Sequence, residues 1–213
     1  MLAGQLSETE AARAGARAVE LLPKAPNLRA REPLAHAVAA LAGRLGDKKE
    51  ARRLCAAASR HVLEAMEQWI DEWGRDGFLD LAYALVALSK GLGEKEAAGF
   101  CAAAARRILK TQNLRTLSED GAAMNREFFA LQALASSLGE KEAVEVANLM
   151  RQLAVDSTAA EPDGNRRRMC IRVEMAETMM VLSGRMGEKE AWEFAGRSLE
   201  DMLLMAYVPP SQA

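Results

Sequence analysis

Several features that mark whole classes of proteins are scarce in this chain of 213 residues. Aromatic residues make up only 5% of it, and no segment alternates apolar and polar residues as a half-buried strand does. Alanine and leucine dominate instead, which is typical of closely packed helices rather than sheets. The three cysteines are odd in number and have no metal-ligand spacing, so we expect a reducing, cytoplasmic location.

A marked excess of one charge and a long apolar run are also missing. The 28 basic and 30 acidic residues give a formal net charge of −2, whereas a general nucleic-acid binder carries a clear positive excess. No run approaches the roughly 18 apolar residues that a membrane-spanning helix needs. The first residues read directly into a helix start, so we expect no membrane contact and no secretory signal.

The sequence motifs of catalysis and metal binding are missing too. There is no glycine-rich phosphate loop, no nucleophile elbow and no His-Glu helix motif. His36 and His61 are the only histidines, and neither has Cys, Asp or Glu partners at zinc-like spacing. We therefore predict a protein that is not an enzyme, with no catalytic residue, no cofactor and no metal site.

What the chain does have is one short motif that recurs in tandem. Its copies are Leu45–Ala51, Leu92–Ala97, Leu138–Ala143 and Met186–Ala191, with a fainter copy at Leu6–Ala11. The glycines of the four clear copies are 46 to 48 residues apart, and tandem units of this size are the mark of stacked repeats. The fold class that we expect is all-α.

Each copy is predicted to be a turn between two helices. An apolar segment with helical spacing precedes it, and acidic residues that suit a helix start follow it. The glycine can either close the first helix in a left-handed conformation or cap the second helix. The glutamate three positions after the cap can reach back to the backbone, and Ser7 with Glu10 is the clearest such capping box.

Aligning the copies also gives an interpretation of two cysteines. Cys55 and Cys101 fall in one column of the second helices, whose other members are Gly15, Ala147 and Ala195. A position that accepts Cys, Ala or Gly requires a small buried side chain rather than a thiol. We expect both cysteines to be buried, reduced and unreactive.

The motif divides the chain into a single domain of helix pairs. We expect a half repeat at 1–26 and repeats at approximately 27–74, 75–120, 121–165 and 166–213. The expected helices are 31–45, 47–73, 78–92, 94–112, 121–138, 140–155, 168–186 and 188–207, with a loop from 156 to 165 at a Pro-Asp-Gly turn signal. Residues 2–7 align with residues 41–46, so helix 8–22 is expected to lack its partner and to be the least stable part.

The turn Arg44–Ala51 and its copies resemble the α-solenoid superfamily of HEAT and armadillo-like repeats. In particular they are similar to Leu- and Ala-rich tandem repeats of some large bacterial proteins. The resemblance implies a right-handed α-solenoid of about four and a half helix pairs. It also implies a protein-interaction scaffold or regulatory module, part of a larger bacterial protein. The main alternative is a solenoid DNA-repair glycosylase or another nucleic-acid-binding solenoid, which the near-neutral charge disfavours.

Two groups of residues are candidates for binding a partner protein or peptide. Trp69 and Trp73, one helical turn apart, either pack on the next repeat or form an exposed anchor. Arg166, Arg167 and Arg168, with Arg172, either end a solvated loop or bind an anionic partner. A third feature is the methionine-rich last repeat, where core packing and an adaptable face for self-association are both open.

Overall fold

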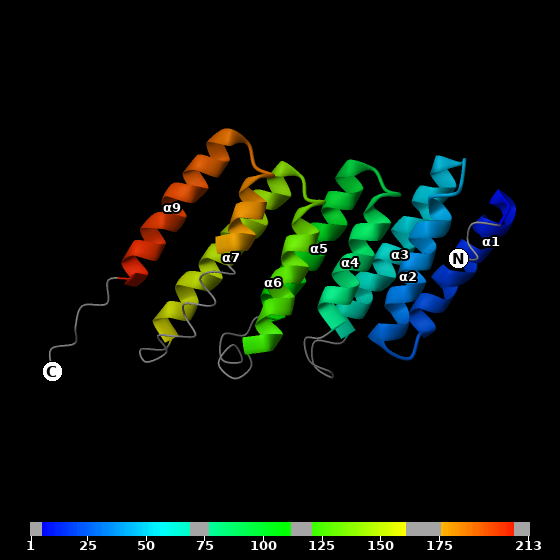
Figure 1. The fold of residues 1–213 in the computed structure, drawn as a ribbon, viewed down its shortest axis with the longest axis horizontal. Coiled ribbons are helices and arrows are strands. Elements are labelled where there is room, and N and C mark those ends of the chain that lie inside the picture. Colours follow the sequence, from blue (N-terminus) through cyan, green and yellow to red (C-terminus); the bar gives the residue numbers. More distant parts are fainter. Residues whose placement is uncertain (1–5, 69–76, 112–120, 161–175, 207–213) are drawn as a thin grey trace.

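The structure is a computed structural model that describes residues 6–68, 77–111, 121–160 and 176–206. Within these ranges all regular structure is helical, which confirms the all-α prediction (Figure 1). The elements are α1 (Glu8–Leu21), the short 3-10 helix η2 (Leu22–Lys24), α2 (Leu28–Ala42), α3 (Lys48–Gln68), α4 (Gly77–Ser89), α5 (Glu94–Thr111), α6 (Gly121–Ala135), α7 (Glu140–Ala160) and α9 (Glu188–Ala206). Residues 176–183 are also helical.

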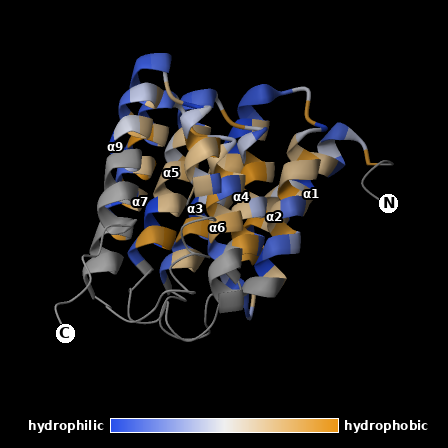
Figure 2. Cartoon of the chain, turned by 60° about the vertical axis from the view of Figure 1, so that its left-hand side comes forward, coloured by the Kyte–Doolittle hydropathy of each residue, from blue (hydrophilic) through white to orange (hydrophobic). Residues whose placement is uncertain are grey.

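The helices alternate between two packed rows. We call α2, α4, α6 and residues 176–183 the first helices, and α1, α3, α5, α7 and α9 the second helices. α4 packs against both α2 and α6, and the second helices from α3 to α9 pack on one another in chain order. The turns that carry the motif lie along one edge of the molecule (top in Figure 1), and Figure 2 shows these turns to be largely hydrophilic.

In three copies the glycine of the motif caps the second helix. The carbonyl oxygens of Gly93, Gly139 and Gly187 each accept a hydrogen bond at 2.9 Å from the alanine amide four residues later. None of the three glycines adopts the left-handed backbone. The capping alternative is therefore confirmed, and the left-handed one is wrong.

Carboxylates lie close to the capping glycine. A Cβ built on Gly139 would lie 2.7 Å from Oε2 of Glu142, and one on Gly187 would lie 2.6 Å from Oε2 of Glu190. Both glutamates stand three residues after the cap, the place predicted for the capping box. A larger residue would push these carboxylates away from the helix start.

The first helices end three residues earlier than the sequence predicted, at residues 42, 89 and 135. The cause is a tighter turn at their ends. The amide of Leu45 donates to Ala42 at 3.1 Å, and that of Leu92 donates to Ser89 at 3.0 Å, each bond spanning three residues instead of four. The apolar residue of the motif thus stands just outside the helix, where it folds back onto the core.

Helix α7 is longer than predicted. It continues to Ala160, so the loop expected at 156–165 does not begin at 156. Neither glycine nor proline occurs between Gly139 and Pro162, and Ala159 and Ala160 are strong helix formers. The predicted start of the loop was wrong because the turn signal at residues 162–164 does not determine where the preceding helix ends.

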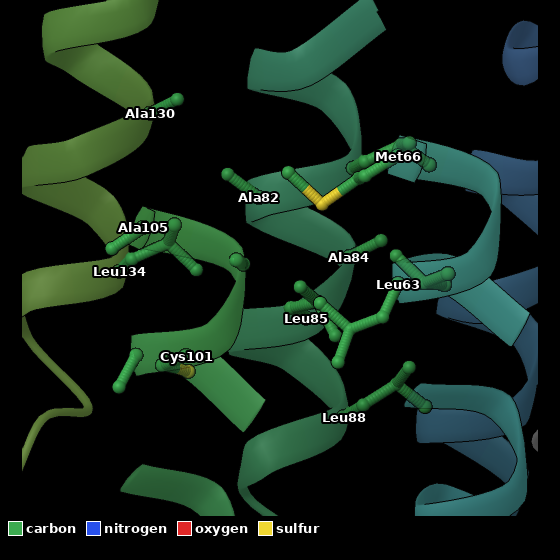
Figure 3. Packing of buried hydrophobic residues seen from close by; sticks show 14 of the residues in the cluster. Leu63, Met66, Ala82, Ala84, Leu85, Leu88, Cys101, Ala105, Ala130 and Leu134 are labelled. Atoms are coloured by element: carbon green, nitrogen blue, oxygen red, sulfur yellow. The ribbon is translucent and has the colours of Figure 1, made fainter. Parts of the chain in front are cut away.

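The core lies between the two rows of helices. Leu85 and Leu88 of α4 lie between side chains of α3 and α5, among them Leu63 and Cys101 (Figure 3). One member of α6 departs from this apolar pattern. Glu127 stands where α2 and α4 have leucines, and it is fully buried.

Candidate functional site

The second helices carry ion pairs that join neighbouring helix pairs. The pairs are Arg52–Glu96 at 2.6 Å, Arg106–Glu145 at 2.8 Å and Arg107–Glu67. Each one connects a second helix to the next second helix along the chain. Three arginines that could otherwise attract phosphate groups are thereby neutralised within the protein.

The first helices present aromatic side chains to solvent instead. Tyr83 of α4 and Phe129 of α6 stand at equivalent positions, each nine residues before the leucine of its turn. Their exposed fractions are 49% and 50%, although large apolar residues of the first helices mostly point inward. His36 and Glu177 hold the same position in α2 and in residues 176–183. We call the line of these four residues the aromatic row, after Tyr83 and Phe129 at its centre.

Small side chains lie beside the aromatic row. One helical turn later, Ala87 and Ala133 take the position of Ala40 in α2, while residues 176–183 have Val181 there. Packed helices are about 8–10 Å apart, so the two rings are separated by roughly that distance with alanines next to them. Tyr83 and Phe129 therefore project from adjacent helices, with an alanine one helical turn after each.

The charges around the row are mixed: Asp80 of α4 is acidic, and Arg126 holds the equivalent position in α6. Asp80 stands three residues before Tyr83, on the same side of α4, and Glu177 ends the row. Neither carboxylate makes an ion pair within the described part of the chain. Glu32 lies 3.7 Å from Nε2 of His36. Asp80, Glu32 and Glu177 can therefore contact a positively charged group of an apolar ligand.

The small-residue column predicted for the cysteines is a contact between helix pairs. Cys55 and Cys101 are both fully buried and free, which confirms the predicted burial, while their lack of reactivity stays a prediction. A Cβ on Gly91 of the next helix pair would lie 2.5 Å from Sγ of Cys55. Burial raises the pKa of each thiol from 9.0 to about 11, and for Cys101 a hydrogen bond with Ser137 acts in the opposite direction. Both thiols are thus protonated near neutral pH and shielded from reagents.

The other predicted site residues fall outside the described ranges. These are Trp69, Trp73, Arg166, Arg167, Arg168 and Arg172, whose alternatives stay predictions. Among the residues that the structure does describe, no three His, Cys, Asp or Glu side chains come together as metal ligands. His61 lies 3.0 Å from a single carboxylate, that of Glu64.

Sequence reasoning missed the aromatic row, although a signal for it exists. The column of His36, Tyr83, Phe129 and Glu177 changes character from copy to copy, unlike the core columns of leucine and alanine. A variable column on a helix is typical of an exposed position, and two aromatic residues at an exposed position suggest recognition. The same test would have singled out Trp192, whose equivalents are Arg52, Ala98 and Val144.

Comparison with known proteins gives no relative from which a role could be transferred. No protein-family model matches the chain, and no curated protein matches it. No helix in the described ranges has the length and apolar character required to cross a membrane. The functional argument therefore rests on the surfaces of the molecule alone.

Proposed function

We propose that this protein is a non-catalytic interaction module, built as a right-handed α-solenoid of HEAT and armadillo-like helix pairs. Its binding surface is the aromatic row on the first helices. The observation that carries the proposal is the equivalent placement of Tyr83 and Phe129, both half exposed, on adjacent helices. Tyrosine and other aromatic residues supply much of the energy at protein interfaces, and solvent-exposed aromatic rows without such a role are costly to keep soluble.

The partner is an amphipathic helix with a basic edge. Two rings about 10 Å apart match the side chains at positions i and i+7 of a helix, because each residue rises about 1.5 Å along the axis. A helix laid across α4 and α6 places apolar residues against both rings and on the alanines between them. Its lysine or arginine residues then face Asp80 and Glu177.

The nucleic-acid alternative has less support. A DNA-repair glycosylase of this architecture needs a continuous cationic groove, and Arg52, Arg106 and Arg107 are paired with glutamates instead. Asp80 and Glu177, beside the aromatic row, repel a phosphate backbone. Both observations favour a protein ligand.

The test uses a library of 16-residue helical peptides in which positions i, i+3, i+4 and i+7 and the edge positions i+1, i+5 and i+8 are randomised. Peptides are selected on the full-length protein and measured by fluorescence anisotropy. We expect selected peptides to carry large apolar residues at i and i+7 and lysine or arginine on one edge. The variant Tyr83→Ser/Phe129→Ser should bind them at least about 10-fold more weakly, the loss of one strong interface contact.

A matched control changes the second helices. Arg52→Ser/Arg106→Ser removes exposed side chains of comparable size and should leave peptide affinity unchanged. Equal affinity for wild type and the Tyr83→Ser/Phe129→Ser variant, or a library that yields no binder, would show that the aromatic row is not a binding site. Circular dichroism confirms that each variant keeps its helix content.

A further inference from the structure

The start of α2 differs in charge from the starts of the second helices. Each second helix has at least one glutamate in its first turn, such as Glu10 in α1 and Glu96 in α5. The first turn of α2 has no acidic residue and contains two arginines, Arg29 and Arg31. The free amides and the dipole make a helix start electropositive, so two cations there are unfavourable unless an anion lies close to them.

Arg31 is buried without the hydrogen bonds that its burial calls for. It is only 7% exposed, and its Nε has no hydrogen-bond acceptor in the described part of the chain. Burial lowers the pKa of the guanidinium, while the charge of Glu64 acts in the opposite direction. Buried charged groups are otherwise paired and hydrogen-bonded, because removing them from water without a partner is costly.

The carboxylates nearest to Arg31 in charge and in sequence are held elsewhere. Glu64 of α3 lies 3.0 Å from Nδ1 of His61 on the same helix, and 58% of its side chain is exposed. Glu32, next to Arg31 in the chain, lies 3.7 Å from Nε2 of His36. Neither carboxylate forms an ion pair with Arg31, and solvent screens the charge of both.

The side chain of Arg31 extends toward the N-terminus of α2. Side chains on a helix lean toward its N-terminus, and Arg31 is the fourth residue of α2, so its side chain covers the first turn. Asn27 accepts the amide of Ala30 at 2.9 Å, whereas the amides of residues 28 and 29 have no partner inside the helix. The guanidinium and these amides therefore face the same end of α2, directly after η2 and its exposed Lys24.

The other helix pairs show that the fold does not need an arginine at this position. The equivalent residue is Phe78 in α4 and Met124 in α6. In α2 an arginine replaces an apolar residue and gains no hydrogen bond inside the described part of the protein. An unsatisfied buried group of this kind indicates an ion or ligand that completes it.

We propose that the start of α2 binds a phosphate group, either free phosphate or a small phosphate monoester. The guanidinium of Arg31 donates to the phosphate oxygens, and the amides of residues 28 and 29 donate from the helix start. A guanidinium matches two oxygens of a phosphate group, and a helix start adds amides that point at the anion. The bound phosphate is the acceptor for the buried Arg31, and it also neutralises the charge of Arg29.

Thermal unfolding of the full chain in increasing inorganic phosphate tests the proposal, with sodium chloride keeping the ionic strength constant. A ligand that binds only the folded state raises the melting temperature, by about 5 °C for a chain of this length at 20 times its dissociation constant. Glycerol phosphate should act as inorganic phosphate does. Acetate should not raise the melting temperature, which distinguishes a phosphate site from a carboxylate site.

Variants of Arg31 connect the response to this residue. Arg31→Met introduces the residue that α6 has here; it should abolish the response to phosphate without lowering the melting temperature in chloride alone. Arg31→Lys keeps the charge but not the planar fork, and it should raise the dissociation constant for inorganic phosphate at least about 10-fold in isothermal titration calorimetry. The matched control Arg60→Met, at an exposed arginine of α3, should keep the full response.

Four outcomes would overturn the proposal. Wild type could respond to phosphate no more than to chloride, or Arg31→Met could respond as wild type does, which would be a general salt effect. A large fall in the melting temperature of Arg31→Met in chloride alone would mean that Arg31 already has a partner inside the protein. An equal response to acetate would assign the site to carboxylates. Stabilisation by inorganic phosphate but not by glycerol phosphate would support the site and restrict its ligand to free phosphate.

Discussion

Helices α1 and α9 stand at opposite ends of the described helices, and each begins at a copy of the turn motif. Helix α1 directs Ala11 and Gly15 toward its neighbours and leaves Arg13 and Arg17 outside. Helix α9 directs Phe194 inward but leaves Trp192 outside. The same motif therefore specifies the turn and the inner packing of a helix, while the outer face of each end is set by residues that the motif does not include.

The two helix starts also differ in where their hydrogen bonds originate. Ser7 caps α1 through its own side chain, and its amide donates to Glu10 at 2.8 Å, so this cap uses only residues of its own motif copy. At the start of α9, the carboxylates of Glu140 and Glu190 approach Gly187, and Glu140 belongs to the preceding helix pair. The start of α1 is capped by residues of its own motif copy, whereas the start of α9 lies against a residue of the preceding helix pair.

The largest expected difference in the free energy of unfolding is between a variant of the interior Gly91 and a variant of Gly196 in the last helix. Gly91→Leu forces a side chain against Cys55, and overpacking of this kind destabilises by about 2–3 kcal/mol. Gly196→Leu places the same side chain in open space and should not destabilise the monomer. Urea unfolding of both variants in dilute solution measures the difference. Similar losses from both variants would mean that the interior contact is no tighter than the end.

A second comparison uses Glu8 and Glu188, the first residues of α1 and α9. Glu8 accepts hydrogen bonds from the amides of Gly46 at 2.7 Å and Asp47 at 3.2 Å, whereas Glu188 has no following turn to cap in the described chain. Glu8→Gln should destabilise by about 1 kcal/mol, because a charge-assisted bond at an exposed helix start is weakened. Glu188→Gln should cost less than about 0.5 kcal/mol. Thermal unfolding measures the loss of stability in each variant. Equal losses would mean that both glutamates stabilise only through the helix dipole.

The small-residue column allows the interior and the end to be compared by thiol chemistry. At pH 8, Cys55 and Cys101 should resist a thiol reagent in the folded protein, whereas the thiol of Ala195→Cys in dilute protein should react within seconds. Cys55→Ala and Cys101→Ala should each cost about 1 kcal/mol or less, being near-isosteric changes. Rapid labelling of Cys55 or Cys101 in a Cys170→Ala background would contradict their burial.

The raised thiol pKa values add a dependence on pH. Unfolded thiols ionise near pH 9, while the folded ones stay protonated to about 11, so the unfolded state loses protons first. The contribution of both thiols to stability is complete below pH 9 and is lost as the pH rises to 11. Wild type should lose stability across this window more steeply than Cys55→Ala/Cys101→Ala. Parallel curves for the two proteins would count against the shift.

The smallest effect is expected from the ion pairs between second helices. A double-mutant cycle on Arg106 and Glu145 should give a coupling of about 0.5 kcal/mol, since the pair is partly exposed. Salt should reduce this coupling. The pair Arg197–Glu193, within α9, should give a similar or smaller value. A coupling above about 2 kcal/mol at Arg106 would mean that these pairs, and not apolar packing, join the helix pairs.

Much of the fold follows from the sequence because each helix pair repeats the same local choices. Periodic leucines, a capping residue and a glutamate three positions later all act over a single turn of helix, so Ser7 with Glu10 could be identified directly. The burial of Cys55 could also be predicted from the sequence, because the aligned copies have only glycine, alanine or cysteine at this position. The end of α7 was missed because the turn signal lies beyond the helix and says nothing about where the helix stops.

The candidate site was harder to predict because it depends on which side of a helix remains uncovered. Tyr83 resembles a core aromatic residue when its own helix is considered alone, and only packing by α2 and α6 shows that it points away from the core. Glu127 illustrates the reverse case, a carboxylate buried at a position where other copies have leucine. Such choices depend on contacts between helices and not on local spacing.

The hydrogen bonds that the amides of Gly46 and Asp47 donate to the carboxylate of Glu8 bear on the order in which the helices can fold. A ribosome delivers the N-terminal helices first, so the acceptor is in place before the donors leave the exit tunnel. Helix α3 can therefore start on an acceptor that is already folded, and it does not have to wait for a segment that is still to be synthesised.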